Sequence, residues 1–192
     1  MPAVPGRAPR RDAQRNRALL IETAARAFKR DGLEVGVDEL ARRAGVGVAT
    51  LYRHFPTKGA LVLAVADELL DELARRRDAI LAEGPPGGEL ARFLRAALAH
   101  LRANRGFVEA LQRHPPDPEI RRRMRRRLLR LLEPLAQRAR ETGELAAGYD
   151  AEDLRIALRM VGAASKPDGA RDPERYLALV LRGLGEPPPR LP

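Results

Sequence analysis

The 192-residue sequence predicts an all-α protein. Few windows alternate apolar and polar residues as strands do, whereas apolar residues recur at spacings of three and four. Alanine, leucine, arginine and glutamate are abundant, and all four have high helix propensity. Nearly every gap between the periodic windows contains glycine or proline, which end helices. We therefore expect a succession of helices joined by short loops.

Four helices are expected in the first 83 residues. Gly32 ends the first, Gly45 ends the second, and Pro56 stops the third. Thr57 follows as a candidate N-cap for the fourth and longest helix. The predicted ranges are 12–31, 37–44, 48–54 and 58–83.

Five further helices are expected after the glycine- and proline-rich loop at 84–88. Asp117, Asp150 and Asp172 each stand where an N-cap is needed, and the first and last of them precede a proline suited to the first helical position. Pro134 lies inside the third of these helices and should kink or split it. The predicted ranges are 89–104, 105–113, 118–141, 151–165 and 173–184.

Composition limits the class of protein. There is no cysteine, which excludes disulfides and thiolate metal sites, and no apolar run is long enough to span a membrane. The basic N-terminal segment lacks the apolar core of a secretory signal, so we expect a cytoplasmic protein. No metal-ligand spacing, phosphate loop or nucleophile constellation is present, so we expect neither a cofactor nor an enzyme.

The charge distribution favours a polyanionic partner. The net charge is +10, and 33 of the 36 basic residues are arginine. Residues 1–58 hold 12 basic and 6 acidic residues, so the first third of the chain carries more than half of the excess. Nucleic acid is the first expectation, an anionic membrane surface is the second, and scattered surface charge from a coding preference for arginine is the third.

Residues 37–55, VDELARRAGVGVATLYRHF, have the pattern of a helix-turn-helix. Leu40 faces inward from the first short helix, and Ala44 is small enough for the helices to cross closely. Gly45 takes a backbone conformation that a side chain would disfavour. Leu51 and Phe55, four residues apart, hold the second helix on the core. Its remaining surface is then free to enter a DNA major groove.

The aromatic and basic residues around this second helix suggest contacts with phosphate. Tyr52 and His54 can donate hydrogen bonds to phosphate oxygens. Lys58 stands at the start of the next helix, where its ammonium and the free backbone N–H groups attract the same anion. The candidate DNA-binding residues are Gly47, Val48, Ala49, Thr50, Tyr52, Arg53, His54 and Lys58.

Residues 17–61 resemble the DNA-binding domain of the TetR family of bacterial transcriptional regulators. Three segments carry the resemblance: LLIETAARAFKRDG, VDELARRAGV and TLYRHFPTKGAL. It implies an all-helical homodimer with three N-terminal helices for DNA and a larger C-terminal domain for a small ligand and for dimerisation. The expected domains are a disordered basic arm (1–11), a DNA-binding domain (12–57), a ligand-binding and dimerisation domain (58–185) and a disordered tail (186–192).

The sequence departs from the family pattern at two helix starts. Gly36 and Gly47 stand where members often carry a hydroxyl or another polar residue, so phosphate contact there would come from backbone N–H groups. Val48 and Ala49 also offer no side-chain hydrogen bond. We expect base reading to depend on thymine methyl groups and Thr50, with Arg53 or arginines of the arm adding groove contacts.

The C-terminal domain should contain the effector pocket and the dimer interface. With so few aromatic residues the pocket should be mostly aliphatic and suit an apolar or amphipathic effector. The candidate pocket residues are Phe93, Ala97, His100, Leu101, Phe107, Leu111, Met124 and Met160. The resemblance implies an interface built from the last two helices of each subunit. The candidate interface residues are Leu154, Ala157, Val161, Ala164, Leu177, Val180, Leu181 and Leu184.

The function expected from the sequence is a ligand-responsive DNA-binding regulator. It would be a repressor that a small molecule releases from a pseudo-palindromic operator. Two alternatives stay open: an architectural or sequence-tolerant DNA-binding protein without an effector, and a helical enzyme or carrier that has lost DNA binding. The basic run 121–130 is read as a solvated helix face, with an anionic ligand site or a second polyanion contact as the rival interpretation.

Overall fold

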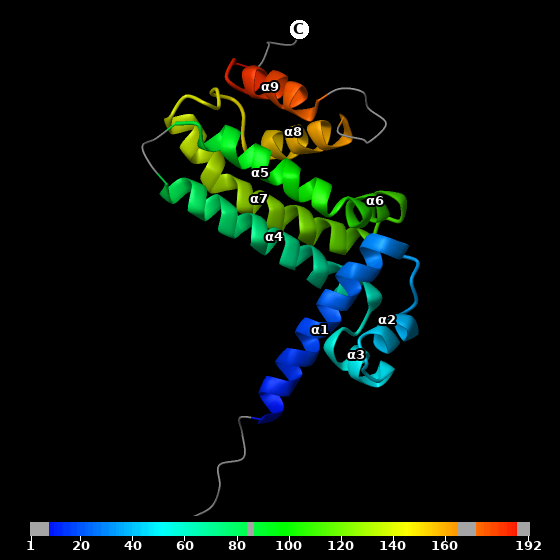
Figure 1. The fold of residues 1–192 in the computed structure, drawn as a ribbon. Helices are drawn as coiled ribbons and strands as arrows, with labels where there is room; N and C mark the ends of the chain where they lie inside the picture. The colour runs from blue at the N-terminus through cyan, green and yellow to red at the C-terminus, as the bar shows by residue number, and fades with distance from the viewer. Residues whose placement is uncertain (1–7, 84–86, 165–171, 188–192) are drawn as a thin grey trace, which may run out of the picture. The chain divides into compact units, whose positions relative to one another are not determined.

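A computed structural model describes residues 8–83, 87–164 and 172–187, which form nine helices and no strand (Figure 1). The all-α prediction is confirmed. These residues fall into two compact units, which we call unit 1 and unit 2. Unit 1 comprises residues up to 68 together with 104–121, and unit 2 comprises 69–103 together with the chain from 122 onward.

The helix bounds agree with the predicted ranges to within one residue, except at the start of the first helix. That helix begins at Ala8, so part of the predicted disordered arm is helical. Residues 1–7 of the arm and 188–192 of the tail lie outside the described residues. The helices are α1 (Ala8–Asp31), α2 (Val37–Arg43), α3 (Val48–His54), α4 (Lys58–Ala82), α5 (Glu89–Ala103), α6 (Arg105–Arg113), α7 (Pro118–Glu141), α8 (Ala151–Ala164) and α9 (Pro173–Leu184).

Side-chain caps explain why so many helix starts were predictable. Thr57, Asp117, Asp150 and Asp172 each accept a hydrogen bond from a backbone N–H two or three residues further on, at 2.7–3.2 Å. Each cap satisfies N–H groups that the first turn of a helix leaves without an intrahelical partner. The four predicted N-caps are therefore confirmed.

Pro134 does not split α7, which continues through it. Proline has no N–H to offer the carbonyl of Arg130, one turn earlier. The carbonyl of Leu131, the residue after Arg130, accepts a hydrogen bond from Nη1 of Arg77 at 2.8 Å. A side chain from α4 thus binds the backbone of α7 where the helix is weakened.

In unit 1, α6 packs directly on the last turn of α1. A Cβ added at Gly106 would lie 2.0 Å from the carbonyl oxygen of Lys29, so the two backbones touch there. Next to this contact the rings of Phe28 and Phe107 stack, with centroids 6.1 Å apart. The segment 104–121, which the sequence assigned to the C-terminal domain, is part of this unit.

Unit 2 is built around α5, α7, α8 and α9, with the second half of α4 packed beside them. α5 contributes one continuous apolar face, and α8 and α9 pack on it and on each other. The backbone N–H of Ala146 donates to the carbonyl of Leu184 at 2.8 Å, which ties the end of α9 to the loop after α7. The most deeply buried side chains include Leu90, Phe93, Leu94, Leu132, Leu135, Leu145 and Leu154.

We predict that Gly106→Ala destabilises the protein. The new methyl group would overlap the Lys29 carbonyl and force α6 away from α1, at a cost of about 1–3 kcal/mol as for other overpacked sites. The free energy of unfolding, measured by urea titration with circular dichroism, checks this.

Gly162→Ala in α8 is the matched control. Its Cβ would lie 3.7 Å from Cδ1 of Leu101, an ordinary contact, so helix propensity should make the change neutral or stabilising by up to about 1 kcal/mol. Equal effects of the two substitutions would contradict the close α1–α6 contact.

Candidate nucleic-acid interface

The turn between α2 and α3 is fixed by Gly45. Its φ of 66° is left-handed, as the sequence predicted. The N–H of Gly45 donates to the Arg42 carbonyl at 3.1 Å, and the N–H of Val46 donates to the Ala41 carbonyl at 3.0 Å. This is the Schellman arrangement, which satisfies the last carbonyls of α2 while reversing the chain. The direction in which α3 leaves the turn is thereby set.

α3 is anchored by one side only. Leu51 is fully buried and Phe55, at its C-cap, is 3 % exposed. The guanidinium of Arg17 on α1 lies 5.3 Å from the centroid of the Phe55 ring, a cation–π contact. These contacts hold α3 in unit 1 and leave its opposite side facing solvent.

The solvent-facing side of α3 carries the predicted DNA-binding residues. Gly47, Ala49, Tyr52 and Arg53 are exposed, and the other four candidates, Val48, Thr50, His54 and Lys58, are partly exposed. Tyr52 is 47 % exposed, so its hydroxyl is accessible to a partner. Within the described parts of the chain, no carboxylate pairs with Arg53 or Lys58. Their positive charges are available to an external anion.

The starts of α2 and α3 lack side-chain caps, as expected from Gly36 and Gly47. Gly36 and Gly47 have extended backbones and make no side-chain cap for α2 and α3. At α4, Thr57 uses its hydroxyl oxygen to accept the N–H of Ala60. Lys58 is the first residue of this long helix. The positive end of the helix dipole adds to the charge of the Lys58 ammonium.

Unlike Arg53 and Lys58, the arginines on and beside α2 are neutralised by carboxylates. Asp31 accepts hydrogen bonds from Arg30 and Arg43, and Glu39 accepts from Arg42 and Arg43 at 2.7 and 2.6 Å. These hydrogen bonds hold the pKa of Asp31 and of Glu39 at about 2. The resulting network ties α2 to the end of α1.

Comparison with known proteins identifies the fold and the motif together. Residues 20–65 match the family model for bacterial regulatory proteins of the tetR family. Residues 85–186, more than half of the chain, match the C-terminal domain of SbtR-like transcriptional regulators. The chain belongs to the TetR family of bacterial transcriptional regulators. It is accordingly a DNA-binding regulator, and the family is not one of enzymes.

Solved TetR-family structures align with almost the whole chain. A regulator from Mycobacterium vanbaalenii is 35% identical, with 91% of this chain and 98% of that chain covered and a TM-score of 0.62. One from Streptomyces coelicolor is 32% identical, with 88% and 97% covered and a TM-score of 0.61. An HTH-type regulator of Staphylococcus aureus (strain USA300) is 38% identical over 63 residues, 32% of this chain and only 34% of that protein's length.

The predicted pocket residues belong to two different units. Phe93, Ala97 and His100 are buried on α5 in unit 2, with Leu101 partly buried beside them, whereas Phe107 and Leu111 belong to unit 1. Met124 is partly exposed and Met160 is 60 % exposed. Burial lowers the pKa of His100, which the carboxylate of Glu72 only partly offsets. A common pocket for the eight residues stays a prediction.

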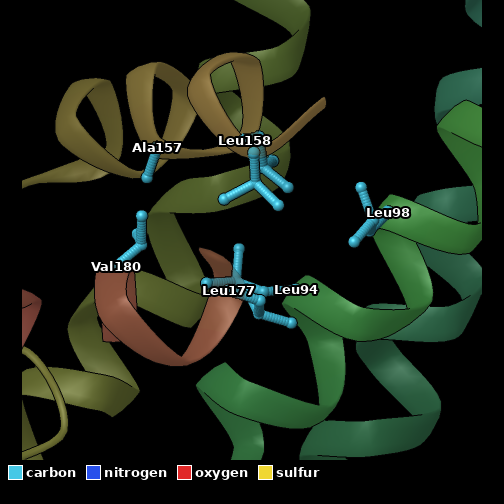
Figure 2. Close-up of a pocket in the computed structure, with 7 residues that line it drawn as sticks. Leu94, Leu98, Ala157, Leu158, Leu177 and Val180 are labelled. Atoms are coloured by element: carbon cyan, nitrogen blue, oxygen red, sulfur yellow. The ribbon is translucent and has the colours of Figure 1, made fainter. Parts of the chain in front are cut away.

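Most of the predicted interface residues are covered within the single chain. Leu154, Ala157, Val161, Leu177 and Leu184 are buried, whereas Val180 and Leu181 are partly exposed. The side chain of Ala164 lies outside what is described. Figure 2 shows side chains of α5, α8 and α9 pointing toward one another. The gap that they line has no room for a water molecule.

The same two helices, α8 and α9, leave other apolar side chains in solvent. Ile156, Met160 and Leu179 are 42 %, 60 % and 62 % exposed. Periodicity marked the apolar face of each helix that packs inside the chain, which is the wider face. Of the outer set, the sequence had selected only Met160, as a pocket residue, and not Ile156 or Leu179.

The described residues contain neither a candidate metal site nor a candidate membrane span. No described group of three or more His, Asp or Glu side chains could hold a metal ion. None of the described helices combines the length and the apolarity that a bilayer crossing needs.

We predict that the stabilising effect of Arg43 depends on pH. The lowered pKa values of Asp31 and Glu39 mean that their ion pairs stabilise the fold above the ordinary carboxyl pKa and lose that effect as pH falls toward 2. Arg43→Gln should therefore lower the urea midpoint near neutral pH, and the difference from wild type should shrink between about pH 4.5 and pH 2.

The control for this test is Arg53→Gln, because no described carboxylate pairs with Arg53. Its difference from wild type should be small and constant over the same range of pH. A constant difference for Arg43→Gln as well would show that the network does not act through these carboxylates.

Proposed function

We propose that this TetR-family protein is a ligand-responsive repressor that binds a pseudo-palindromic operator as a homodimer. The observation that carries the proposal is the outer side of α3, where Tyr52 and Arg53 are exposed and Arg53 has no carboxylate partner in the described residues. Nearby arginines of the same unit are neutralised by Asp31 and Glu39. Positive charge is thus kept available on α3.

Phosphate binding is assigned to the end of α3 and the start of α4. Tyr52 offers a hydroxyl and His54 an imidazole, and both side chains are accessible. Lys58 adds an ammonium at the positive end of the α4 dipole. Together these groups orient the protein on the duplex, because phosphate contacts set position and not sequence.

Base reading is assigned to Val48, Ala49, Thr50 and Arg53. The first two can contact thymine methyl groups, Thr50 can bond to several bases, and an arginine can bind guanine with two hydrogen bonds. Because one short helix supplies few such contacts, the affinity of a single subunit should be low. Two copies spaced one helical turn apart on the duplex would provide two half-sites.

The second subunit is assigned to the outer sides of α8 and α9. Ile156, Met160 and Leu179 are the large apolar side chains that the single chain leaves most exposed on these helices. Exposed apolar groups of this size favour a protein partner, and most soluble oligomers are symmetric homodimers. The interface we propose therefore uses these residues together with Val180 and Leu181.

Release by an effector is assigned to unit 2. The helix α4 starts with Lys58 and continues into unit 2 without interruption. A ligand that binds better to one position of α4 than to another would shift the population between a DNA-binding and a released state. The effector is expected to be apolar or amphipathic.

We predict that Lys58→Glu strongly weakens binding to DNA fragments from upstream of the protein's own gene and its neighbours. A phosphate contact is lost and a repulsion is added in each subunit, so the dissociation constant should rise about a hundredfold. Lys58→Gln should reduce the slope of log K against log salt by about 0.9 per lysine. Fluorescence anisotropy across a salt series measures both effects, and its saturation point should give two chains per operator.

Lys29→Glu is the matched control, since Lys29 is an exposed lysine on α1 of the same unit. It should change the affinity only a few-fold. If both reversals weakened binding equally, a diffuse charge effect would replace the phosphate contact at Lys58.

The apolar start of α3 also favours the architectural alternative, and competition separates the two. A repressor should prefer its operator to random duplex by about a thousandfold or more. A ratio near one would instead identify a sequence-tolerant DNA-binding protein.

We predict that two N-cap substitutions at the start of α3 have the same effect on stability but different effects on DNA binding. The extended backbone of Gly47 suits other residues, and the nearest atom to an added Cβ is Oγ1 of Thr50 at 4.0 Å. Gly47→Ser and Gly47→Asp should both stabilise the fold by a few tenths of a kcal/mol. Only the aspartate places a negative charge where DNA phosphate would lie, so it should bind operator about tenfold more weakly than the serine variant.

Urea titration and anisotropy of the two variants check this prediction. Equal operator affinities for the serine and aspartate variants would remove the start of α3 from the interface.

A further inference from the structure

A groove of about 210 Å³ runs between α4 and α7, wholly within unit 2. The two helices lie side by side in Figure 1. The groove is distinct from the narrow gap in Figure 2, which α5, α8 and α9 line. Its lining residues are Leu70, Asp71, Ala74 and Arg77 of α4 with Arg127, Arg130 and Leu131 of α7.

The lining combines an apolar strip with a positive rim. Leu70, Ala74 and Leu131 supply the apolar part and belong to, or pack against, the core of unit 2. The lining holds three guanidinium groups and one carboxylate, that of Asp71, and therefore carries a net charge of +2. Asp78, which does not line the groove, pairs with Arg77 and reduces this surplus to +1. An apolar strip with a surplus of positive charge suits a molecule that has an anionic end and a hydrocarbon end.

Two of the three arginines are held in place. Arg77 donates from Nη1 to the Leu131 carbonyl at 2.8 Å and from Nη2 to Asp78 at 2.6 Å, and its side chain is only 14 % exposed. Arg127 is paired with Asp71 across the groove. Their positions are therefore largely set before any ligand arrives, which lowers the entropy cost of binding.

Arg130 is the available cation of the groove. It is exposed, and no carboxylate pairs with it in the described residues. Other arginines of α7 are matched: Arg125 with Glu152 at 3.0 Å and Arg138 with Glu89 at 3.3 Å. Arg121 and Arg123 of α7 also lack a carboxylate partner in the described residues, but neither lines the groove. At Arg130 an unmatched charge lies beside an apolar strip, and the guanidinium geometry suits two-point binding of carboxylate or phosphate.

We propose that this groove binds a small amphipathic anion, with its carboxylate or phosphate at Arg130 and its aliphatic part on Leu70, Ala74 and Leu131. The volume is below the roughly 300–1,000 Å³ of pockets for drug-sized ligands, so the hydrocarbon part is short. The assignment of this anion as the effector rests on the proposed function, whereas its binding does not. A ligand there would contact α4 and α7 at once and favour one arrangement of the two helices.

The test uses the full chain and four probes in isothermal titration calorimetry at physiological salt. Octanoate and octyl phosphate carry both features, octanol lacks the anion, and inorganic phosphate lacks the hydrocarbon. The variants are Arg130→Gln, which removes the available charge, and Ala74→Leu, which fills the groove without changing charge. Arg123→Gln is the control, being the same substitution at an exposed arginine of α7 that does not line the groove.

Octanoate, octyl phosphate or both should bind, and octanol and inorganic phosphate should bind at least about tenfold more weakly. The probe that binds more tightly identifies the head group as carboxylate or phosphate. Arg130→Gln and Ala74→Leu should each weaken binding about tenfold, as expected for one lost charge-assisted hydrogen bond or a blocked apolar strip. Arg123→Gln should leave binding unchanged.

Three results would overturn the inference: no binding of either amphipathic probe, equal weakening by Arg130→Gln and Arg123→Gln, or unchanged binding in both groove variants. Anisotropy with operator DNA is measured on the same preparations. A protein that binds operator but no probe refutes the groove alone, and one that binds octanoate but no DNA refutes the proposed function alone.

Discussion

The DNA-binding surface depends on the burial of Leu51 and Phe55. α3 has seven residues, too few to be stable as an isolated helix. Its conformation is maintained by these two side chains, by the left-handed turn at Gly45 and by the cation–π contact from Arg17. Because all of these contacts are on one side, the other side can vary its residues for recognition without loss of the helix. The residues that hold α3 in the fold are therefore different from those on its exposed, DNA-facing side.

Pairing with carboxylates, more than the number of arginines, decides where positive charge stays available on this protein. The chain is rich in arginine throughout, yet Arg42, Arg43, Arg125 and Arg155 are occupied by nearby carboxylates. Those left without a described carboxylate partner include Arg53 on α3 and Arg130 in the α4–α7 groove. A paired arginine mainly stabilises structure, whereas an unpaired one can bind an anion. The pairing pattern therefore tells more about function than the net charge of +10.

The helix ends could be predicted from the sequence, because they depend on residues close together in the chain. Aspartate caps, helix-ending glycines and the glycine turn fixed helix ends because each acts within a few residues. The rules could not say what each apolar face packs against. Phe107 meets Phe28 in unit 1 because Gly106 lets α6 touch α1, and Leu154 is covered by its own chain. The α4–α7 groove was missed because its α4 residues and its α7 residues lie 50 to 61 positions apart in sequence. The basic run 121–130 had nevertheless raised an anion site as a rival interpretation.

The division of the chain into units has an evolutionary consequence. Residues 104–121 belong with the DNA-binding helices, although residues 69–103 of the other unit precede them in the sequence. A recombination event that joined the first 68 residues to a foreign effector domain would lose α6 and leave Phe28 without its stacking partner. New combinations of operator and effector specificity should therefore arise by point substitution within an intact chain more readily than by exchange of contiguous gene segments.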